Sequence, residues 1–115
     1  MPVTPKRARE LALALENATE VPHFDRAAFR TPRRIFATLA RSGGDMNFAF
    51  DHEQQKHFCE RAPEVISPVP GGWGRMGFTS CDLARVDTKT FTDALKAAHA
   101  RANTPLKKPA RRKRG

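Results

Sequence analysis

The first apolar residues of the chain recur at the spacing of a helix. They are Ala8, Leu11, Ala12 and Leu15. Residues three and four apart share one face of a helix, so this pattern predicts an amphipathic helix. Thr4 can cap its first turn, and Pro5 has the backbone conformation that suits the first helical position. We expect this helix to end near Asn17.

Two further helices are indicated by residues that cap helix ends. Asp51, followed three residues later by Gln54, fits a capping box, and Pro63 should end the helix that this box begins. Asp87 can cap a last helix, which should stop at Asn103-Thr104-Pro105. The apolar stripe of that helix consists of Phe91, Ala94, Leu95 and Ala98.

Between the helices the pattern changes to that of strands. Pro22 excludes a helix interior, so residues 19–30 should form two short extended pieces with a turn at Asp25-Arg26. Residues 33–50 predict a hairpin that turns at Ser42-Gly43-Gly44-Asp45. Another strand is expected over residues 75–83, after a loop over residues 63–74. The returning hairpin strand carries Met46, Phe48 and Phe50 on one face.

The predicted order of elements is α-β-β-β-β-α-β-α. Strands joined by short turns pair antiparallel, and helices on one face of such a sheet leave its other face partly exposed. The fold class is therefore α+β. A chain of 115 residues is one domain with room for a core. We expect residues 1–105 to form this domain and residues 106–115 to be a disordered basic tail.

The chain carries a net charge of +9, and much of it lies at the C-terminus. Removing the six charges of the tail leaves +3 for residues 1–106. A positive field favours anionic partners such as nucleic acid, anionic membrane or acidic protein, whereas a bare charge run can also serve only solubility. Both interpretations of the tail stay open. Its basic residues are Lys107, Lys108, Arg111, Arg112, Lys113 and Arg114.

The N-terminal sequence and the cysteine count indicate the cellular setting. The stretch MPVTPKRARE does not lead into the apolar core of a signal peptide, and no apolar run approaches the roughly 20 residues of a membrane span. Cys59 and Cys81 are too few for a disulfide scaffold. We expect a cytoplasmic monomer without a membrane partner.

Candidates for catalysis or metal binding are weak. His52, His57 and Cys59 share one predicted helix, but residues five apart lie about 140° apart around it, so the three cannot converge on one metal ion. His23 has no marked nucleophile beside it, and Cys81 has the pattern of a small core residue. Neither a phosphate-binding loop nor a convincing carboxylate pair is present. We therefore expect neither enzymatic activity nor a cofactor.

The most distinctive segment is PVPGGWGRMGFTSCDL, which begins at Pro68. Together with FDRAAFRT-PRRIFATLA, the aromatic strand ending at Phe50 and the start of the helix after it, this segment resembles the MmcQ/YjbR family of small bacterial proteins over about residues 8–102. The resemblance implies a frataxin/CyaY-like fold, and family members are described as binding DNA through a double-wing arrangement. The basic tail is not part of the family pattern. Frataxins hold iron on an acidic first helix, and Lys6, Arg7 and Arg9 make that role unsuitable here.

The leading functional prediction is non-enzymatic binding of DNA rather than RNA. Arginines near hairpin turns can contact phosphates, and the tail would add affinity that is independent of base sequence. The predicted contacts are Arg26, Arg30, Arg33, Arg34, Arg41, Trp73, Arg75 and the six basic residues of the tail. Charged side chains also protect exposed sheet edges, which is the competing explanation for the arginines of the body.

Trp73 admits two interpretations. A tryptophan in a glycine-rich loop is more often a packing residue than a stacking platform, so we expect it to be largely buried. The alternative function is a module that binds a protein or a small ligand with the open sheet face around Trp73. An enzyme would need a pocket that joins His23 with Asp25 or Arg75.

Overall fold

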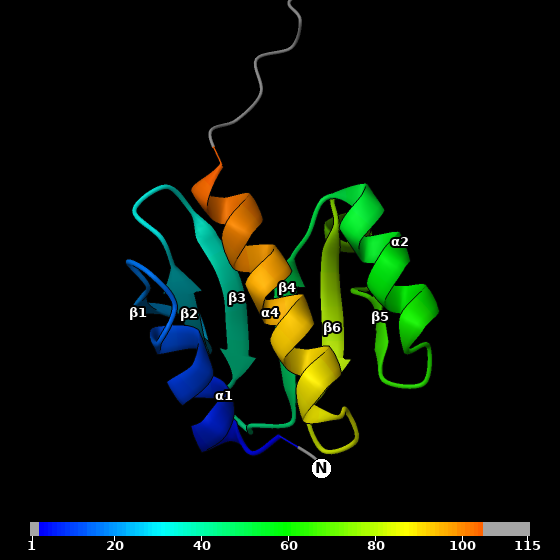
Figure 1. Cartoon of the computed structure of the whole chain (residues 1–115), viewed down its shortest axis with the longest axis horizontal. Coiled ribbons are helices and arrows are strands. Elements are labelled where there is room, and N and C mark those ends of the chain that lie inside the picture. Colours follow the sequence, from blue (N-terminus) through cyan, green and yellow to red (C-terminus); the bar gives the residue numbers. More distant parts are fainter. Residues whose placement is uncertain (1–2, 105–115) are drawn as a thin grey trace, which may run out of the picture.

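The computed structural model describes residues 3–104, which form one antiparallel sheet with helices packed on it (Figure 1). The elements are α1 (Pro5–Leu13), β1 (Thr19–His23), β2 (Arg26–Arg30), β3 (Ile35–Ala40), β4 (Asp45–Ala49), α2 (His52–Arg61), β5 (Ile66–Pro68), α3 (Gly72–Arg75), β6 (Phe78–Asp82) and α4 (Thr88–Asn103). The strand order across the sheet is β1-β2-β3-β4-β6-β5. In Figure 1, α1, α4 and α2 lie in front of the sheet, and α4 crosses β3 and β4. The predicted α+β class is confirmed.

The core lies between α4 and the face of the sheet that the aromatic pattern predicts. Phe48 and Phe50 are stacked with ring centroids 5.3 Å apart, and Phe91 of α4 lies 5.9 Å from Phe48. Phe58 of α2 stacks on Phe50 at 5.3 Å. Met46, on the same strand, is also fully buried. The predicted burial of the alternate residues of β4 is therefore confirmed.

The predicted caps are confirmed. The side chain of Thr4 accepts a hydrogen bond from the amide of Arg7, and Asp51 forms a complete capping box with Gln54. Asp87 accepts the amide of Thr90 at 2.9 Å at the start of α4. The first helix ends earlier than predicted, at Leu13 instead of near Asn17. The chain then turns into β1 through Asn17, whose φ of 59° is left-handed.

Two elements interrupt the predicted loop over residues 63–74, so the predicted order is incomplete. β5 pairs with β6, where Ile66 lies opposite Cys81, and α3 follows it. The strand expected over residues 75–83 is shorter, since Arg75 ends α3 and β6 begins at Phe78. Neither element was predicted, because both are too short to show a hydrophobic period and both lie in a segment rich in proline and glycine.

The two ends of the sheet carry different elements. The loop end comprises the last residue of β2 with the β2–β3 loop (residues 30–34), the β4–α2 junction (50–51), α3 with the residues after it (72–77) and the last turn of α4 (101–104). The turn end comprises the β1–β2 turn (residues 24–25) and the β3–β4 turn (residues 41–44). The first of these turns is one residue earlier than expected, with Phe24 at a φ of 58° and Arg26 already in β2.

The two cysteines should differ in reactivity. Burial, helped by the charges of Asp82 and Asp45, raises the pKa of Cys81 to about 12, whereas Cys59 is only partly buried. The thiolate is the reactive form, so a chromogenic thiol reagent at about pH 8 should label one equivalent per native chain and the second only after unfolding. In a Cys59→Ser variant, native labelling should vanish. Equal labelling rates for both thiols in the native protein would contradict the burial of Cys81.

Candidate nucleic-acid interface

The arginines predicted to contact phosphates divide between the two ends of the sheet. Arg26 lies opposite Ala40 in the β2–β3 ladder, next to Arg41, so both are at the turn end. Arg30 ends β2, and Arg33 and Arg34 lie in the loop after it, at the loop end. Arg26 and Arg30 are therefore at opposite ends of the sheet, because the length of β2 separates them.

Arg26 is used by the sheet itself. Its Nε donates to the Thr38 hydroxyl at 2.8 Å, and one of its terminal nitrogens donates to an Asp45 carboxylate oxygen at 2.7 Å. The same nitrogen also donates to the carbonyl of Thr38 at 3.1 Å. This network uses Nε and one terminal nitrogen of the guanidinium, and the ion pair with Asp45 neutralises its charge within β2, β3 and β4. Arg26 is therefore a structural residue in this arrangement and does not join the candidate interface.

The β2–β3 loop is fixed to the end of α4 by Thr31. The Thr31 hydroxyl accepts the amide of Arg33 at 3.1 Å and donates to the carbonyl of Ala102 at 3.2 Å. Arg34 donates to the carbonyl of Thr104 at 3.3 Å. The guanidinium of Arg30 donates to two carbonyls of the loop itself, and most of its five N–H groups stay free. These hydrogen bonds fix the backbone of the loop, and with it the positions from which its arginines extend.

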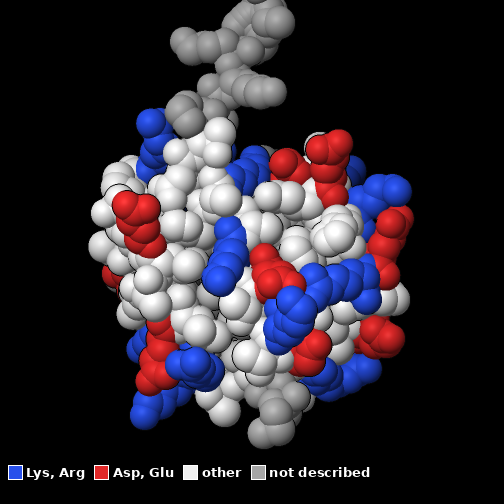
Figure 2. All heavy atoms as spheres, viewed as in Figure 1, with Lys and Arg blue, Asp and Glu red and all other residues white. Residues whose placement is uncertain are grey.

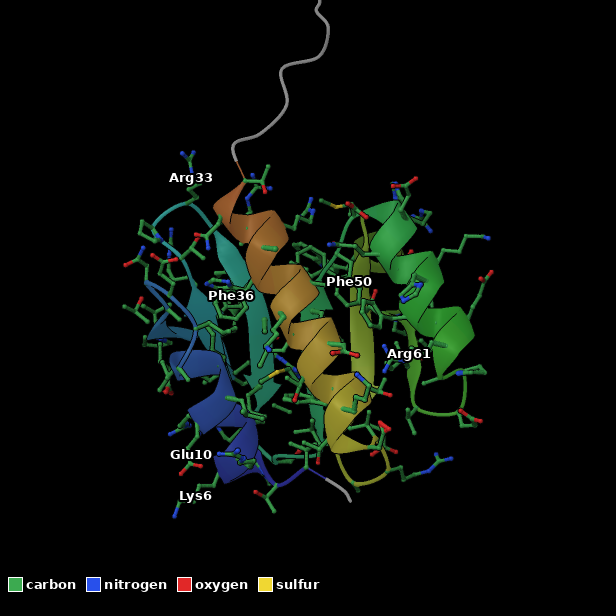
Figure 3. The ribbon with its side chains drawn as sticks, viewed as in Figure 1. Lys6, Glu10, Arg33, Phe36, Phe50 and Arg61 are labelled. Carbon is green, nitrogen blue, oxygen red and sulfur yellow. The ribbon has the colours of Figure 1, made fainter. Side chains whose placement is uncertain are left out.

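Arg101 of α4 joins this loop, although no sequence pattern singles it out. Burial, and next the neighbouring charge of Arg34, lower the pKa of Arg101 from its ordinary value. Arg33 is exposed and points away from the molecule at this end, while Lys6 lies at the opposite end (Figure 3). Arg101 could be found from sequence only by its position in the last helical turn, where a cation favours the helix dipole.

The loop end holds most of the basic side chains that lack an acidic partner. Within residues 3–104, seven Lys and Arg side chains form ion pairs with carboxylates. Eight others do not, and five of them lie at the loop end: Arg30, Arg33, Arg34, Arg75 and Arg101. Over the helix face, by contrast, basic and acidic side chains are interspersed (Figure 2). Asp51 also lies at the loop end, where its carboxylate is bonded to the amide of Gln54 at 2.7 Å.

Trp73 is exposed, so the expectation that it is a packing residue is wrong. Its side chain is 62% exposed and touches Phe78 edge-on, with ring centroids 5.3 Å apart. Met76, at the end of the same short helix, is also 62% exposed. Exposed large apolar side chains that lie together mark binding surfaces more often than scattered ones do.

The turn that carries Trp73 is held in place by contacts from two sides. The side-chain amide of Gln55 donates to the carbonyls of Gly74 at 2.8 Å and Phe78 at 3.3 Å. The ring of His52 bonds to the carbonyl of Arg75. Gly77 has a φ of +112°, and a Cβ there would overlap the carbonyl oxygen of Phe50. The glycine at this position therefore allows a close backbone contact that fixes α3, rather than making it loose.

Trp73 and Arg30 lie on the same face at the same end of the sheet. Phe36 faces α4, because its ring packs edge-on against His99 of that helix. Its neighbour Ile35 faces the other way, and so does Arg30, which lies opposite Ile35. Thr79 is buried and lies opposite Phe48, on the face that α4 covers. Its neighbour Phe78 therefore faces the other way. Arg30 and Phe78 thus both face away from α4, on the open face. Three strand spacings separate them, which is roughly 14 Å.

The six basic residues predicted as contacts in the tail, Lys107 to Arg114, lie outside the described residues. Thr104, the last described residue, belongs to the loop end. The basic segment therefore continues in sequence directly from the end of the molecule that carries the unpaired arginines.

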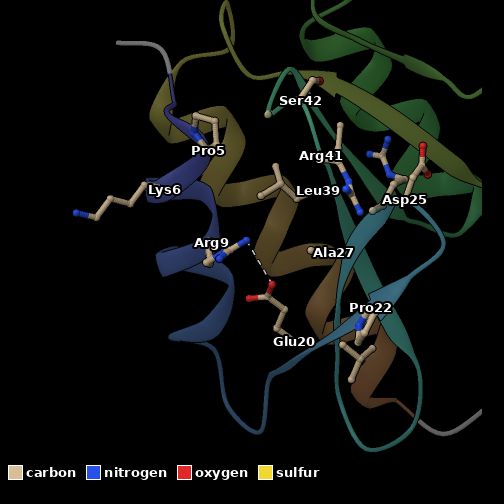
Figure 4. Close-up of a pocket in the computed structure, with 14 residues that line it drawn as sticks. Pro5, Lys6, Arg9, Glu20, Pro22, Asp25, Ala27, Leu39, Arg41 and Ser42 are labelled. Carbon is tan, nitrogen blue, oxygen red and sulfur yellow. Dashed lines mark ion pairs between the residues drawn. The ribbon is translucent and has the colours of Figure 1, made fainter.

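A groove of about 790 Å³ lies at the turn end, between α1 and strands β1 to β3 (Figure 4). Pro22, Ala27 and Leu39 give it an apolar wall, and Arg9 pairs with Glu20 across it at 3.3 Å. Arg41 and Asp25 line it, but His23 and Arg75 are not among its described lining residues. The pocket that an enzyme would need, joining His23 with Asp25 or Arg75, is not this groove.

Two further observations concern residues 3–104. This part of the chain contains no group of three or more His, Cys, Asp or Glu side chains placed to hold a metal ion. In the same range, no helix combines the length and the apolar character that crossing a membrane requires.

The comparisons with known proteins agree with the fold. The YjbR family model matches residues 13–101, which is most of the chain. The crystal structure of the Deinococcus radiodurans protein DR2400, which has a DUF419 domain, is similar with a TM-score of 0.70 and 15% sequence identity, over 84% of this chain and 75% of that chain. No curated protein matches the sequence. Because the family model covers more than half of its residues, this chain belongs to the YjbR family.

Proposed function

We propose that this protein binds DNA without catalysing a reaction, and that it does so through the loop end and the basic tail. The observation that carries the proposal is the gathering of five unpaired arginines, among the described residues, at the point from which the tail continues. Guanidinium groups free of carboxylates are available for phosphate oxygens, and each contact releases counterions from DNA. We propose in addition that the fold is frataxin-like and that the protein is cytoplasmic.

The fixed geometry of the loop supports a contact with the DNA backbone. Thr31 ties the loop to α4, so Arg33 and Arg34 lose little backbone freedom when they bind. Arg33 is exposed, and Arg34 is held beside the carboxyl end of α4 by one hydrogen bond to a carbonyl. Phosphate contacts of this kind position DNA without reading its sequence.

Replacing Arg33 and Arg34 by glutamine should weaken binding to a duplex of about 20 base pairs by roughly 30-fold at about 0.15 M salt, since each lost phosphate contact costs about fivefold there. The slope of log affinity against log salt should become shallower by about 2. Fluorescence anisotropy at several salt concentrations measures both quantities.

The matched control removes the same charge from the turn end. Lys6 and Arg41 are exposed and form no ion pair with a described carboxylate, so Lys6→Gln with Arg41→Gln gives an equal net charge. This variant should bind within about threefold of the native protein. Equal losses in the two variants would mean that the overall charge, and not the loop end, binds DNA.

A second candidate function is a module that binds a protein or a small ligand through the open face around Trp73. It is favoured by the exposure of Trp73 and Met76 on one short helix. Trp73 is the only tryptophan and the chain has no tyrosine, so the intrinsic fluorescence reports on this surface alone. A spectral change with a protein or a metabolite, and none with oligonucleotide, would favour this second function over DNA binding.

A further inference from the structure

We propose that the nucleic acid bound at the loop end is single-stranded, with an unpaired base stacked on Trp73 and phosphates further along the same strand held by the arginines of the β2–β3 loop. This inference rests on the proposed function and names its substrate class. The shared chemistry is an unpaired base on a phosphodiester chain, which DNA and RNA single strands both offer.

The first support is that the fold holds Trp73 outward. Trp73 is 62% exposed, and its one ring contact among the described residues is edge-on with Phe78, with the ring centroids 5.3 Å apart, so much of the indole is accessible to a base. Gln55 and the close contact at Gly77 fix the turn on which the ring is carried. A ring that is both exposed and fixed loses little freedom when a base stacks on it.

The second support is the chemistry of stacking. In a duplex the faces of the bases are covered by their neighbours, so an indole can stack only on a base that is unpaired or flipped out. Stacking on aromatic side chains combined with a positively charged groove is the common way in which proteins bind single strands without sequence preference. Trp73 supplies the first part, and Arg75 is two residues from it in the chain.

The third support is the distribution of charge on the open face. From Phe78, which Trp73 contacts, to Arg30, across roughly 14 Å of the loop end, the face presents Ala49 and Ile35, which are uncharged. At the opposite end of the same face, Asp45 lies directly across from Asp82. Asp45 is paired with Arg26 and Asp82 with Arg85, so these two arginines are already held by carboxylates. A strand should therefore follow the rim of the loop end, where the arginines have no carboxylate partner, and not the length of the sheet.

The test compares three oligonucleotides of one mixed sequence, each about 15 nucleotides long: a DNA single strand, its RNA counterpart and the DNA duplex. The full-length native protein should bind at least one single strand about tenfold or more tightly than the duplex at about 0.15 M salt, and its tryptophan fluorescence should be quenched. Trp73→Ala should weaken single-strand binding by roughly 5- to 150-fold, the usual value of one stacked base, and leave duplex binding unchanged.

Phe24→Ala is the matched control, because Phe24 is an aromatic residue that is 93% exposed but lies at the turn end. It should change single-strand affinity by less than about threefold. Duplex binding as tight as that of both single strands, with unquenched fluorescence, would overturn this inference and leave the proposed DNA binding intact. Failure of all three oligonucleotides to bind would overturn both. Quenching is measured on the native protein, so the test does not depend on how well a variant folds.

Discussion

Deleting residues 107–115 should weaken binding to nucleic acid more than any single substitution in the folded body. The segment carries six of the net nine positive charges of the chain. If all six reach phosphates, the slope of log affinity against log salt should become shallower by about 5. Even three contacts correspond to a loss of more than about 100-fold at about 0.15 M salt. Anisotropy titrations of the native and shortened chains at several salt concentrations measure this change.

The control for the deletion keeps the length of the segment and removes only its charge. A chain with glutamine at all six basic positions of the tail should behave like the shortened chain, because the attraction is electrostatic and does not depend on the other residues of the tail. An unchanged slope in either variant would show that the tail serves solubility and does not contact nucleic acid.

Gly77→Ala should destabilise the protein by more than about 3 kcal/mol, the second large effect that we expect. Its φ of +112° is strained for any residue with a side chain, and an added Cβ would overlap the carbonyl oxygen of Phe50. The oxygen belongs to the backbone, so the β4–α2 junction or the turn before β6 must move. Urea unfolding monitored by circular dichroism measures the free energy, since a domain of this size is expected to unfold in one step.

Gly72→Ala is the matched control on the same turn. A Cβ at Gly72 would meet only the guanidinium of Arg75, at 3.6 Å, and the position is the first of α3. Alanine favours helix over glycine, so the unfolding free energy should change by less than about 1 kcal/mol or increase. If Gly77→Ala proved as stable as Gly72→Ala, the close contact between Gly77 and Phe50 would be wrong.

The parts of the fold that were predictable from sequence depend on neighbours in the chain. The capping box of Asp51 and Gln54 uses residues three apart, and the burial of Met46, Phe48 and Phe50 follows from the period of a strand. The resemblance to the YjbR family, carried mainly by the segment around Trp73, is confirmed by the family model. The capping box and the strand period could be predicted because each involves residues within a short stretch of sequence.

The parts that were not predictable depend on residues that meet only after folding. Arg26 is neutralised by Asp45, 19 residues away, because β2, β3 and β4 align in one register. Arg101 comes to the β2–β3 loop only through the packing of α4. The hydrogen bond between Thr31 and Ala102, which are 71 residues apart in the chain, holds the two segments together.

The exposure of Trp73 is a third such case. Packing is the usual fate of a tryptophan, and composition alone cannot show that α3 presents the ring outward. That outcome depends on Gln55 of α2 and on the backbone of Phe50, both of which are distant in sequence from the glycine-rich turn. The same two contacts hold the turn that carries the ring in place.

Binding at the loop end can be mapped residue by residue with nuclear magnetic resonance. The ¹⁵N-labelled full-length chain would be titrated with a DNA oligonucleotide, both as a single strand and as a duplex. We predict that the largest amide shifts fall on residues 30–34, 73–78 and 101–104, with the Trp73 indole N–H moving in the single-strand titration. Shifts centred on the groove at Lys6 and Arg41, or binding that leaves the loop end unshifted, would contradict this prediction.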